Sequence, residues 1–261
     1  MVNISLLTDF GLEDNFVGVM KGVIAKINPQ ARTIDITHSI EAQNILQAGF
    51  ILRSSFSYFP KGTIHLAIVD PGVGSRERKA IIVKTRNYFF VAPDNGILNL
   101  TLEKEKPVKI IEMKNTKYFL KPVSCTFHGR DIFAPVAAYL SRKIKPEAFG
   151  TKLAKLKKLD SPCASFQDNV LKGSIIHIDR FGNLITNIEK SLFNSFVGKS
   201  GFKVRFKNEA LDRISTAYVN TLHGFPLAIF GSFNTLEVSI NKGSACDYFK
   251  ARLFDPIEIV K

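Results

Sequence analysis

The segment TIHLAIVDPGVG, residues 63–74, decides the fold because an apolar run passes directly into an acidic turn. Its first part, residues 63–69, has the length and the branched side chains of a buried strand. Asp70 follows, and the glycines at 72 and 74 let the backbone come close to a ligand. In an open α/β sheet, ligands bind beyond the carboxyl ends of the strands. Asp70 is therefore a candidate ligand contact, with an ordinary turn aspartate as the alternative.

Short apolar runs alternate with helix-length periodic segments around this stretch, which is typical of a mostly parallel sheet covered by helices. The further strands are expected at residues 4–7, 33–37, 80–85 and 88–92, the last two as a hairpin. The helices are expected at residues 15–27, 45–59 and 133–142. The first strand runs into Asp9, whose carboxylate can accept hydrogen bonds from a ribose diol or cap a helix.

The pattern changes at residues 145–168, which are rich in Lys, Pro and Ser and which we interpret as a linker. Beyond it, short strands are expected at residues 170–178, 202–206, 227–230, 236–240 and 256–260. Their close spacing favours a small antiparallel β-barrel-like domain. The sequence thus predicts an α/β fold with an N-terminal α/β domain, residues 1–160, and a C-terminal β domain, residues 169–261.

Composition excludes several classes of function. A net charge of +13 could mark a nucleic-acid surface, but the lysines are scattered, so we expect no nucleic-acid partner; an RNA-binding module remains the alternative of another class. The three cysteines have no pairing or zinc-type spacing and are interpreted as buried thiols in a reducing compartment. No leader and no apolar stretch of roughly 18 residues is found, so we expect no membrane partner and a cytoplasmic protein.

A second candidate site is the segment Phe127-His128-Gly129-Arg130-Asp131 ahead of the helix at 133–142. His128 can exchange protons near neutral pH, although a structural histidine and a local Arg130–Asp131 salt bridge are the alternatives. The other histidines have no metal-type spacing, so no metal site is expected. Glycine-rich nucleotide loops, nucleophile elbows and CxxC pairs are also missing from the sequence.

Polar residues also follow the predicted strands of the second half, where they can serve a ligand or simply satisfy a turn. These residues are Asp179 and Asn183 in one turn, and Ser232, Asn234 and Glu237 in another.

Taken in order, the motifs of this chain resemble the S-adenosylmethionine (SAM) hydroxide adenosyltransferase family, the hydrolase branch of the superfamily that includes the SAM-dependent fluorinase and chlorinase. The motifs are Thr8-Asp9-Phe10-Gly11, Asp70-Pro71-Gly72-Val73-Gly74, Ala92-Pro93-Asp94-Asn95-Gly96, Phe127-His128-Gly129-Arg130-Asp131 and Asp179-Arg180-Phe181-Gly182-Asn183. The resemblance continues through residues 232–237 to 255–258, and therefore spans almost the whole chain.

The resemblance implies an enzyme that hydrolyses SAM to adenosine and methionine without a cofactor, by attack of water on ribose C5′. It implies a homotrimer whose sites lie between the N-terminal domain of one subunit and the C-terminal domain of its neighbour. It also implies a preference for the non-biological sulfonium configuration. The implied roles are ribose binding by Asp9, water activation by Asp70, Arg78 and His128, and contacts of Asp70, Asp179, Asn183, Ser232 and Glu237 with the substrate.

Chemistry favours one choice for the nucleophile and one for the triad arginine. A halogenating adenosyltransferase is the enzymatic alternative, but the carboxylate of Asp70 would repel a halide, so water is the expected nucleophile. The triad arginine of the family falls where this chain has Glu77, between Arg76 and Arg78. We predict Arg78, because the strand that follows fixes side-chain direction while the loop can absorb an extra residue.

Overall fold

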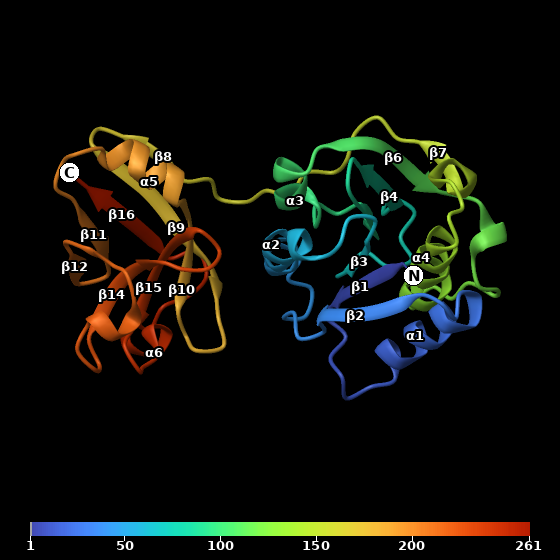
Figure 1. Cartoon of the computed structure of the whole chain (residues 1–261), viewed down its shortest axis with the longest axis horizontal. Coiled ribbons are helices and arrows are strands. Elements are labelled where there is room, and N and C mark those ends of the chain that lie inside the picture. Colours follow the sequence, from blue (N-terminus) through green and yellow to red (C-terminus); the bar gives the residue numbers. More distant parts are fainter. Residues whose placement is uncertain (1) are drawn as a thin grey trace. The chain divides into compact units, whose positions relative to one another are not determined.

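The computed structural model describes residues 2–261, so Met1, the first residue of the predicted N-terminal domain, lies outside the described residues. Two compact units make up the chain, Met1–Leu159 and Asp160–Lys261 (Figure 1). Within residues 2–261, no helix is both long and apolar enough to cross a membrane.

A seven-stranded sheet forms the centre of the first unit, in the order β2-β1-β3-β5-β4-β6-β7. Strands β2, β1, β3, β5 and β6 point one way and β4 and β7 point the other, which confirms the predicted mostly parallel sheet. The strands are β1 (Asn3–Thr8), β2 (Arg32–Thr37), β3 (Ile64–Ile68), β4 (Ala80–Thr85), β5 (Phe89–Pro93), β6 (Pro107–Met113) and β7 (Gly150–Lys152).

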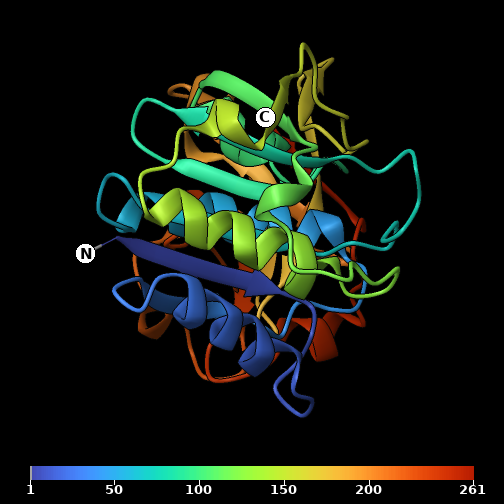
Figure 2. The ribbon, with the colours of Figure 1, turned by 90° about the vertical axis from the view of Figure 1, so that its right-hand side faces the viewer.

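Helices cover both faces of this sheet, as Figures 1 and 2 show. The helices are α1 (Phe16–Ile27), α2 (Ile45–Ser55), α3 (Asn99–Lys104) and α4 (Ala134–Ser141). Side chains alternate along a strand, so Leu6 of β1 packs with Met20 of α1, whereas Leu7 packs with Leu52 of α2. Both faces are therefore buried in the middle of the sheet, which explains why its central strands β1, β3 and β5 are mostly apolar.

Short helical turns connect these elements. They are the 3₁₀ turns η1 (Phe56–Tyr58), η2 (Thr116–Tyr118) and η4 (Pro146–Phe149), and the π-helical turn η3 (Gly129–Phe133) that leads into α4. The predicted helix at 45–59 is too long, because α2 ends at Ser55 and η1 follows. Pro60 disfavours helical backbone at the residue before it, which accounts for the early end.

The second unit contains a nine-stranded sheet in the order β12-β11-β16-β9-β10-β15-β14-β13, with β8 paired to β9. The pairs are antiparallel except β13–β14, and β12 comes back into contact with β14, so the sheet is barrel-like as predicted. The strands are β8 (Ser165–Gln167), β9 (Val170–Ile178), β10 (Leu184–Glu189), β11 (Lys203–Phe206), β12 (Glu209–Leu211), β13 (Ile214–Ser215), β14 (Pro226–Phe230), β15 (Thr235–Ile240) and β16 (Pro256–Val260).

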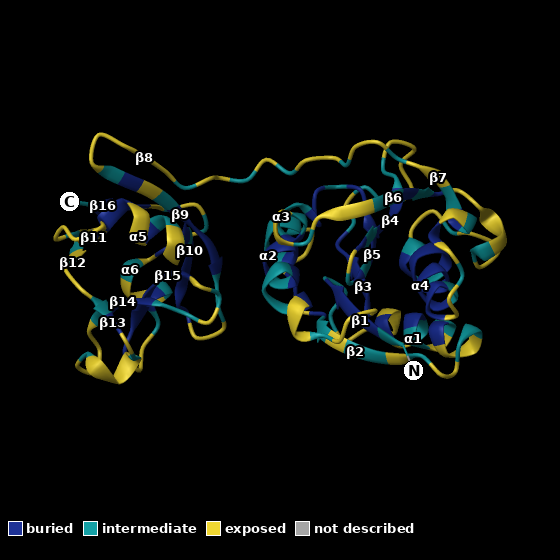
Figure 3. Ribbon diagram, turned by 45° about the horizontal axis from the view of Figure 1, so that its top comes forward, coloured by how far each residue is buried: buried dark blue, intermediate teal, exposed yellow. Residues whose placement is uncertain are grey.

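Helices α5 (Lys190–Val197) and α6 (Ala245–Phe249) and the 3₁₀ turn η5 (Tyr218–Asn220) complete this unit. Its core is built from inward-facing residues such as Leu171, Leu184, Val238 and Ile257, all fully buried, and Figure 3 shows these strands in dark blue.

Two sequence predictions are wrong. The linker predicted at 145–168 contains η4 and β7 at its beginning and β8 at its end, because short strands with exposed polar residues give no clear periodicity. The cysteines are not buried thiols: Cys125 and Cys163 are exposed, and Cys246 is half-buried. Cys125 and Cys163 lie in irregular segments, where no strand or helix face carries them into a core.

Candidate active site

The order of the strands brings the predicted site residues of the first unit to one edge of the sheet. Thr8, the last residue of β1, is the register partner of Ile68, the last residue of β3, so Asp9 and Asp70 follow strands that end at the same level. Strand β4 is antiparallel to β5 and begins where β5 ends. Arg78, two residues before β4, therefore reaches the edge at which β1 and β3 end.

A cavity of about 380 Å³ lies at this edge. It contains three of the residues predicted from the sequence, Asp9, Asp70 and His128, which come from separate parts of the chain. The lining residues are Asp9, Phe10, Phe16, Gln43, Ile68, Asp70, Pro71, Val73, Thr126, Phe127, His128 and Gly129.

Arg78 lies behind the two titratable residues and contacts both. Its Nε lies 3.1 Å from Oδ2 of Asp70, and its Nη2 is in hydrogen-bond contact with Nδ1 of His128. The side chains of Arg78 and Asp70 are each only 6% exposed. The guanidinium also lies over the ring of Phe133, 5.4 Å from its centroid. Arg76 is exposed, so the structure places Arg78, and not Arg76, beside Asp70.

The Asp70 carboxylate is an unusual buried group. Although Arg78 is within ion-pair distance, neither carboxylate oxygen receives an aligned hydrogen bond from any of residues 2–261. Burial raises the pKa of Asp70, and the nearby charge of Asp9 raises it further, while Arg78 and the Gly72 N–H oppose the change. Asp70 is thus a carboxyl group at the cavity wall that still has acceptor capacity for a ligand.

The neighbours of His128 determine which of its ring nitrogens carries the proton. Arg78 can only donate hydrogen bonds, so Nδ1 of His128 must accept, and the neutral ring carries its proton on Nε2. Burial lowers the pKa of His128, as does the charge of Arg78, whereas Asp131 and a hydrogen bond to the Ser124 backbone oppose this. His128 is therefore a neutral ring whose Nδ1 lone pair is already used.

The segment before His128 is fixed by Asp131, which is fully buried. Its Oδ2 accepts a hydrogen bond from the Ser124 N–H at 2.8 Å, and Arg130 donates to both carboxylate oxygens at 2.6 and 3.0 Å. The Ser124 hydroxyl in turn accepts from the Phe127 N–H. The Arg130–Asp131 salt bridge considered from sequence is present, and it anchors the loop that carries His128.

The loop after β3 is fixed from two sides. The Asn95 side-chain amide donates to the carbonyl of Val69, directly before Asp70, at 2.7 Å. Gly74 has a φ of +81°, and a Cβ at this position would lie 2.4 Å from the carbonyl oxygen of Cys125. Only glycine allows this approach, which joins the Asp70 loop to the loop before His128.

Three aromatic rings form one wall of the cavity. The ring of Phe127 lies 6.0 Å from that of Phe10 and 5.1 Å from that of Phe16, both edge to face, and Phe10 and Phe16 are 5.9 Å apart. Gly129 gives them room, because a Cβ there would lie within 3.2 Å of Phe10 and Phe127. The electron-rich faces of such rings attract cations.

The second unit holds the other predicted residues, in two places. In one, Asp179 Oδ1 accepts from the N–H groups of Phe181 and Asn183, and Oδ2 accepts from the Asn183 side chain at 2.8 Å. Both carboxylate oxygens of Asp179 thus accept hydrogen bonds from within its own turn.

In the other, Glu237 is buried, and its Oε1 accepts hydrogen bonds from Tyr218 and Ser239, each at 2.7 Å. Burial raises the pKa of the Tyr218 phenol, and the hydrogen bond to Glu237 raises it further. Ser232 is exposed in the turn between β14 and β15.

Sequence reasoning did not predict several lining residues. Gln43 contributes its backbone, whose N–H donates to Oδ2 of Asp9 at 2.9 Å, and a backbone group leaves no signal in a sequence. The three aromatic residues could not be distinguished in a chain that has 22 phenylalanines. Among residues 2–261, no group of three or more His, Cys, Asp or Glu side chains is arranged to hold a metal ion.

Comparison with known proteins gives consistent matches along both units. The profile of the SAM hydroxide adenosyltransferase N-terminal domain matches residues 4–150, and that of the C-terminal domain matches residues 173–258. A Methanocaldococcus jannaschii protein named (R)-S-adenosyl-L-methionine hydrolase is 36% identical over 267 residues, covering 98% of this chain and 95% of the relative.

More distant and structural matches agree with these. A protein of an Actinoplanes species named fluorinase is 26% identical over 214 residues, covering 72% of each chain. The crystal structure of an uncharacterized conserved protein from Thermotoga maritima superposes with a TM-score of 0.91 at 37% identity, covering 99% of this chain and all of the other.

Proposed function

Because the chain belongs to the SAM hydroxide adenosyltransferase family, we propose that it hydrolyses SAM to adenosine and methionine, with water attacking ribose C5′. The observation that carries the proposal is Asp70, a buried carboxylate at the cavity wall with no aligned hydrogen bond from residues 2–261. Such a carboxylate is a proton acceptor for a bound water molecule.

The cavity also suits the charge of the substrate. SAM carries a sulfonium cation next to C5′, and the cavity combines the carboxylates of Asp9 and Asp70 with the rings of Phe10, Phe16 and Phe127. Carboxylates and aromatic faces both attract cations. In this proposal Asp9, fixed by the Gln43 N–H through one oxygen, uses its remaining acceptor capacity for the ribose diol.

Asp70, Arg78 and His128 divide the work of activating water. The oxygen of water forms a bond to C5′, the C5′–sulfur bond breaks with its electron pair going to sulfur, and one proton of water must be taken up. His128 cannot take it, because its Nδ1 lone pair is used by Arg78, so in this proposal His128 orients the water at the cavity wall. Asp70 accepts the proton, and the charge of Arg78 favours the ionised carboxylate that accepts it.

The protein then has to do little more than align the water molecule with the C5′–sulfur bond. A sulfonium is already a good leaving group, so the departing methionine needs no proton. Near-attack positioning of water and C5′ can supply roughly 7–11 kcal/mol of the barrier reduction. A positioned general base adds about 10² to 10⁴-fold in rate. The proposal therefore requires neither a metal ion nor an organic cofactor.

Other parts of the proposal rest on the family. We place the protein in the cytoplasm as a homotrimer, in which Asp179, Asn183, Ser232 and Glu237 of a neighbouring subunit complete the substrate contacts. We also propose a preference for the R sulfonium epimer, which the name of the Methanocaldococcus relative specifies for that protein. Light scattering of the purified protein tests the trimer independently of activity.

The competing reaction is halogen transfer, because one relative is named fluorinase. The position of Asp70 argues against halogen transfer, because its carboxylate would repel a halide bound beside it in the cavity. A halogenase would release 5′-haloadenosine in chloride or fluoride, whereas the proposed hydrolase releases adenosine in either salt.

The decisive experiment incubates the pure protein with each SAM epimer in oxygen-labelled water and identifies the nucleoside by mass spectrometry. We expect adenosine with the label on its 5′ oxygen, formed faster from the R epimer. Methylthioadenosine, S-adenosylhomocysteine or unlabelled adenosine as the product would refute attack of water at C5′. Equal rates for the epimers would refute the stereochemical preference alone.

A further inference from the structure

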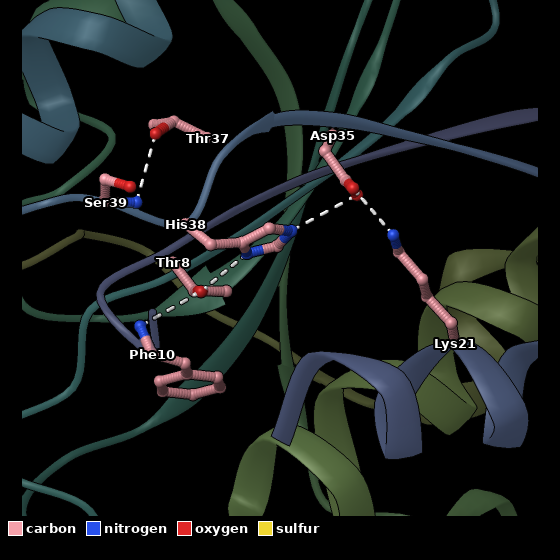
Figure 4. A network of polar contacts seen from close by, with 7 residues as sticks. All are labelled: Thr8, Phe10, Lys21, Asp35, Thr37, His38 and Ser39. Atoms are coloured by element: carbon pink, nitrogen blue, oxygen red, sulfur yellow. Dashed lines mark hydrogen bonds and ion pairs between the residues drawn. The ribbon is translucent and has the colours of Figure 1, made fainter. Parts of the chain in front are cut away.

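His38 has no place in the mechanism above, yet it lies directly behind the turn that carries Asp9 and Phe10. It follows the last residue of β2 and is only 4% exposed, beside the end of β1 (Figure 4). The Thr8–Gly11 turn, which leaves β1, supplies Asp9 and Phe10 to the cavity. A buried histidine at this point therefore deserves a specific explanation.

Both the backbone and the ring of His38 bind this turn. Its carbonyl oxygen accepts the N–H of Gly11 at 2.9 Å, and its Nδ1 lies 2.8 Å from Oγ1 of Thr8. The same Thr8 oxygen accepts the Phe10 N–H at 3.2 Å. The first and last residues of the turn are thus fixed to one side chain and one carbonyl of His38.

The far side of the ring faces a pair of charges on the surface. Nε2 lies 3.2 Å from Oδ1 of Asp35, and Oδ2 of Asp35 accepts a hydrogen bond from Nζ of Lys21 at 2.6 Å. Lys21 and Asp35 are both about one-third exposed, so water screens this pair. Figure 4 shows these contacts in series, from Lys21 of α1 to Phe10 in the turn.

The Thr8 hydroxyl joins His38 to the turn. Its Oγ1 lies 2.8 Å from Nδ1 of His38 and accepts the Phe10 N–H, so the imidazole ring, the hydroxyl and the backbone of the turn form one hydrogen-bonded series. Nε2 of His38 lies within ion-pair distance of Asp35 but has no aligned hydrogen bond among residues 2–261. The ring is therefore held on the side of Thr8, which is the side that fixes the shape of the turn.

We propose that His38 is a positioning residue for substrate binding, which holds the Thr8–Gly11 turn so that Asp9 faces the ribose. This inference rests on the proposed function, because it takes the Asp9 contact with the ribose diol from there. His38 touches neither substrate nor reacting water, and it acts through Thr8 and the backbone of the turn.

A second buried histidine contacts the same strand, β1, and supplies a matched control. His65 of β3 is also buried, and its Nδ1 lies 2.7 Å from Oγ of Ser5, three positions before Thr8 on β1. It is packed among aromatic rings and is not among the described residues that line the cavity. Loss of His65 thus removes a comparable buried contact without touching the turn.

The experiment compares His38→Leu, His38→Asn and Asp35→Asn with His65→Asn. An Asn side-chain amide can hydrogen-bond the Thr8 hydroxyl in place of Nδ1, so His38→Asn is the partial rescue, and Asp35, about one-third exposed, gives a variant at a less buried position. The measurements are hydrogen exchange of the peptide spanning residues 8–14, binding of adenosine and 2′-deoxyadenosine, and the KM and kcat for SAM.

We expect His38→Leu to speed exchange of the turn and to lower the preference for adenosine over 2′-deoxyadenosine about tenfold, as for the loss of one charge-assisted hydrogen bond. KM should rise more than kcat falls, His38→Asn and Asp35→Asn should be intermediate, and His65→Asn should leave the preference unchanged. The preference is the ratio of the affinities for the two nucleosides, so a general loss of folded protein does not change it.

Unchanged exchange of the turn in His38→Leu would refute the clamp, whether or not the protein hydrolyses SAM. Faster exchange with an unchanged nucleoside preference would refute the positioning role. An equal drop of that preference in His65→Asn would show a general effect of destabilisation and would also overturn the proposal. Failure of the wild type to hydrolyse SAM would refute the proposed function, and the exchange result would still decide the clamp.

Discussion

Arg78 approaches Asp70 and His128 from behind, with its Nε 3.1 Å from Oδ2 of Asp70, and it is not among the described residues that line the cavity. The arginine thus sets the charge and the proton positions of its two partners while leaving the space in front of them to the ligand. This arrangement gives each of the three residues a separate test.

The first prediction concerns the neighbouring arginines. Arg78→Ala should be nearly inactive, with turnover reduced by about two orders of magnitude or more, because Asp70 and His128 lose the cation that fixes them. Arg76→Ala is the control and should be nearly normal, since Arg76 is exposed. Steady-state kinetics with SAM check both, and a normal Arg78→Ala would mean that no arginine takes part in water activation.

The second prediction joins activity and stability at Asp70. Because the pKa of Asp70 is raised by burial, its contribution to stability is present at acid pH and is lost as pH rises through the raised value. Asp70→Asn removes this titration, so its stability should fall less than that of the wild type as pH rises from acid to neutral, while turnover falls by about two orders of magnitude. Calorimetry and kinetics on one sample measure both. A less stable but active variant would exclude Asp70 as the proton acceptor.

A third prediction separates binding from chemistry. Asp9→Ala should weaken adenosine binding, whereas His128→Ala should retain nucleoside binding and lose about two orders of magnitude in turnover. Isothermal titration with adenosine and steady-state kinetics distinguish these effects. Equal loss of adenosine affinity in both variants would contradict this division of roles.

The aromatic wall gives a fourth prediction. Phe16→Leu keeps an apolar side chain but removes an aromatic face, so it should weaken binding of the cationic sulfonium by about fivefold. The neutral thioether S-adenosylhomocysteine serves as the matched ligand, and its affinity should change less. Competition against SAM turnover measures both affinities. An equal change for the two ligands would indicate loss of packing and no cation recognition.

His65 predicts how the protein responds to acid. Burial lowers the pKa of His65 to about 3, so the unfolded chain binds a proton at His65 more readily than the folded protein does. The contribution of His65 to the free energy of unfolding is fully present above pH 6.5. It is lost as pH falls toward 3, by roughly 4–5 kcal/mol in all. His65→Phe should flatten the acid side of the stability curve, measured by urea unfolding between pH 7 and 4. A curve as steep as that of the wild type would place the titration elsewhere.

Much of the first unit could be predicted because its strands are buried on both faces. The run before Asp70 and the hairpin of β4 and β5 are mostly apolar, so their ends were correct to about a residue. The hairpin also explains the position of Arg78, since a strand start fixes the side chain two residues before it better than a glycine turn does. Strands β6 and β7 were missed because β6 begins with exposed residues and β7 has three residues.

The site was predictable only where side chains with titratable groups stand at the end of a strand or directly before a helix. Asp9 and Asp70 follow strands and His128 precedes a helix, whereas the link between Asp9 and the Gln43 N–H joins positions 34 residues apart through a backbone atom. His38 shows a further limit. Its importance follows from two contacts with a turn about 30 residues earlier in the chain, and these are not written in local sequence.

Gly74 and Arg78 hold their shared loop at two points, against the Cys125 carbonyl and against Asp70, while the residues between them are exposed. The stretch from Arg76 to Glu77 is also closed by the Ser75 hydroxyl, which accepts the Arg78 N–H at 3.3 Å, so its length is fixed while its side chains are free to vary. An engineer could therefore replace Glu77 with cysteine and attach a fluorophore there without moving either anchor. Such a label would sit close to the cavity mouth and could report ligand entry optically.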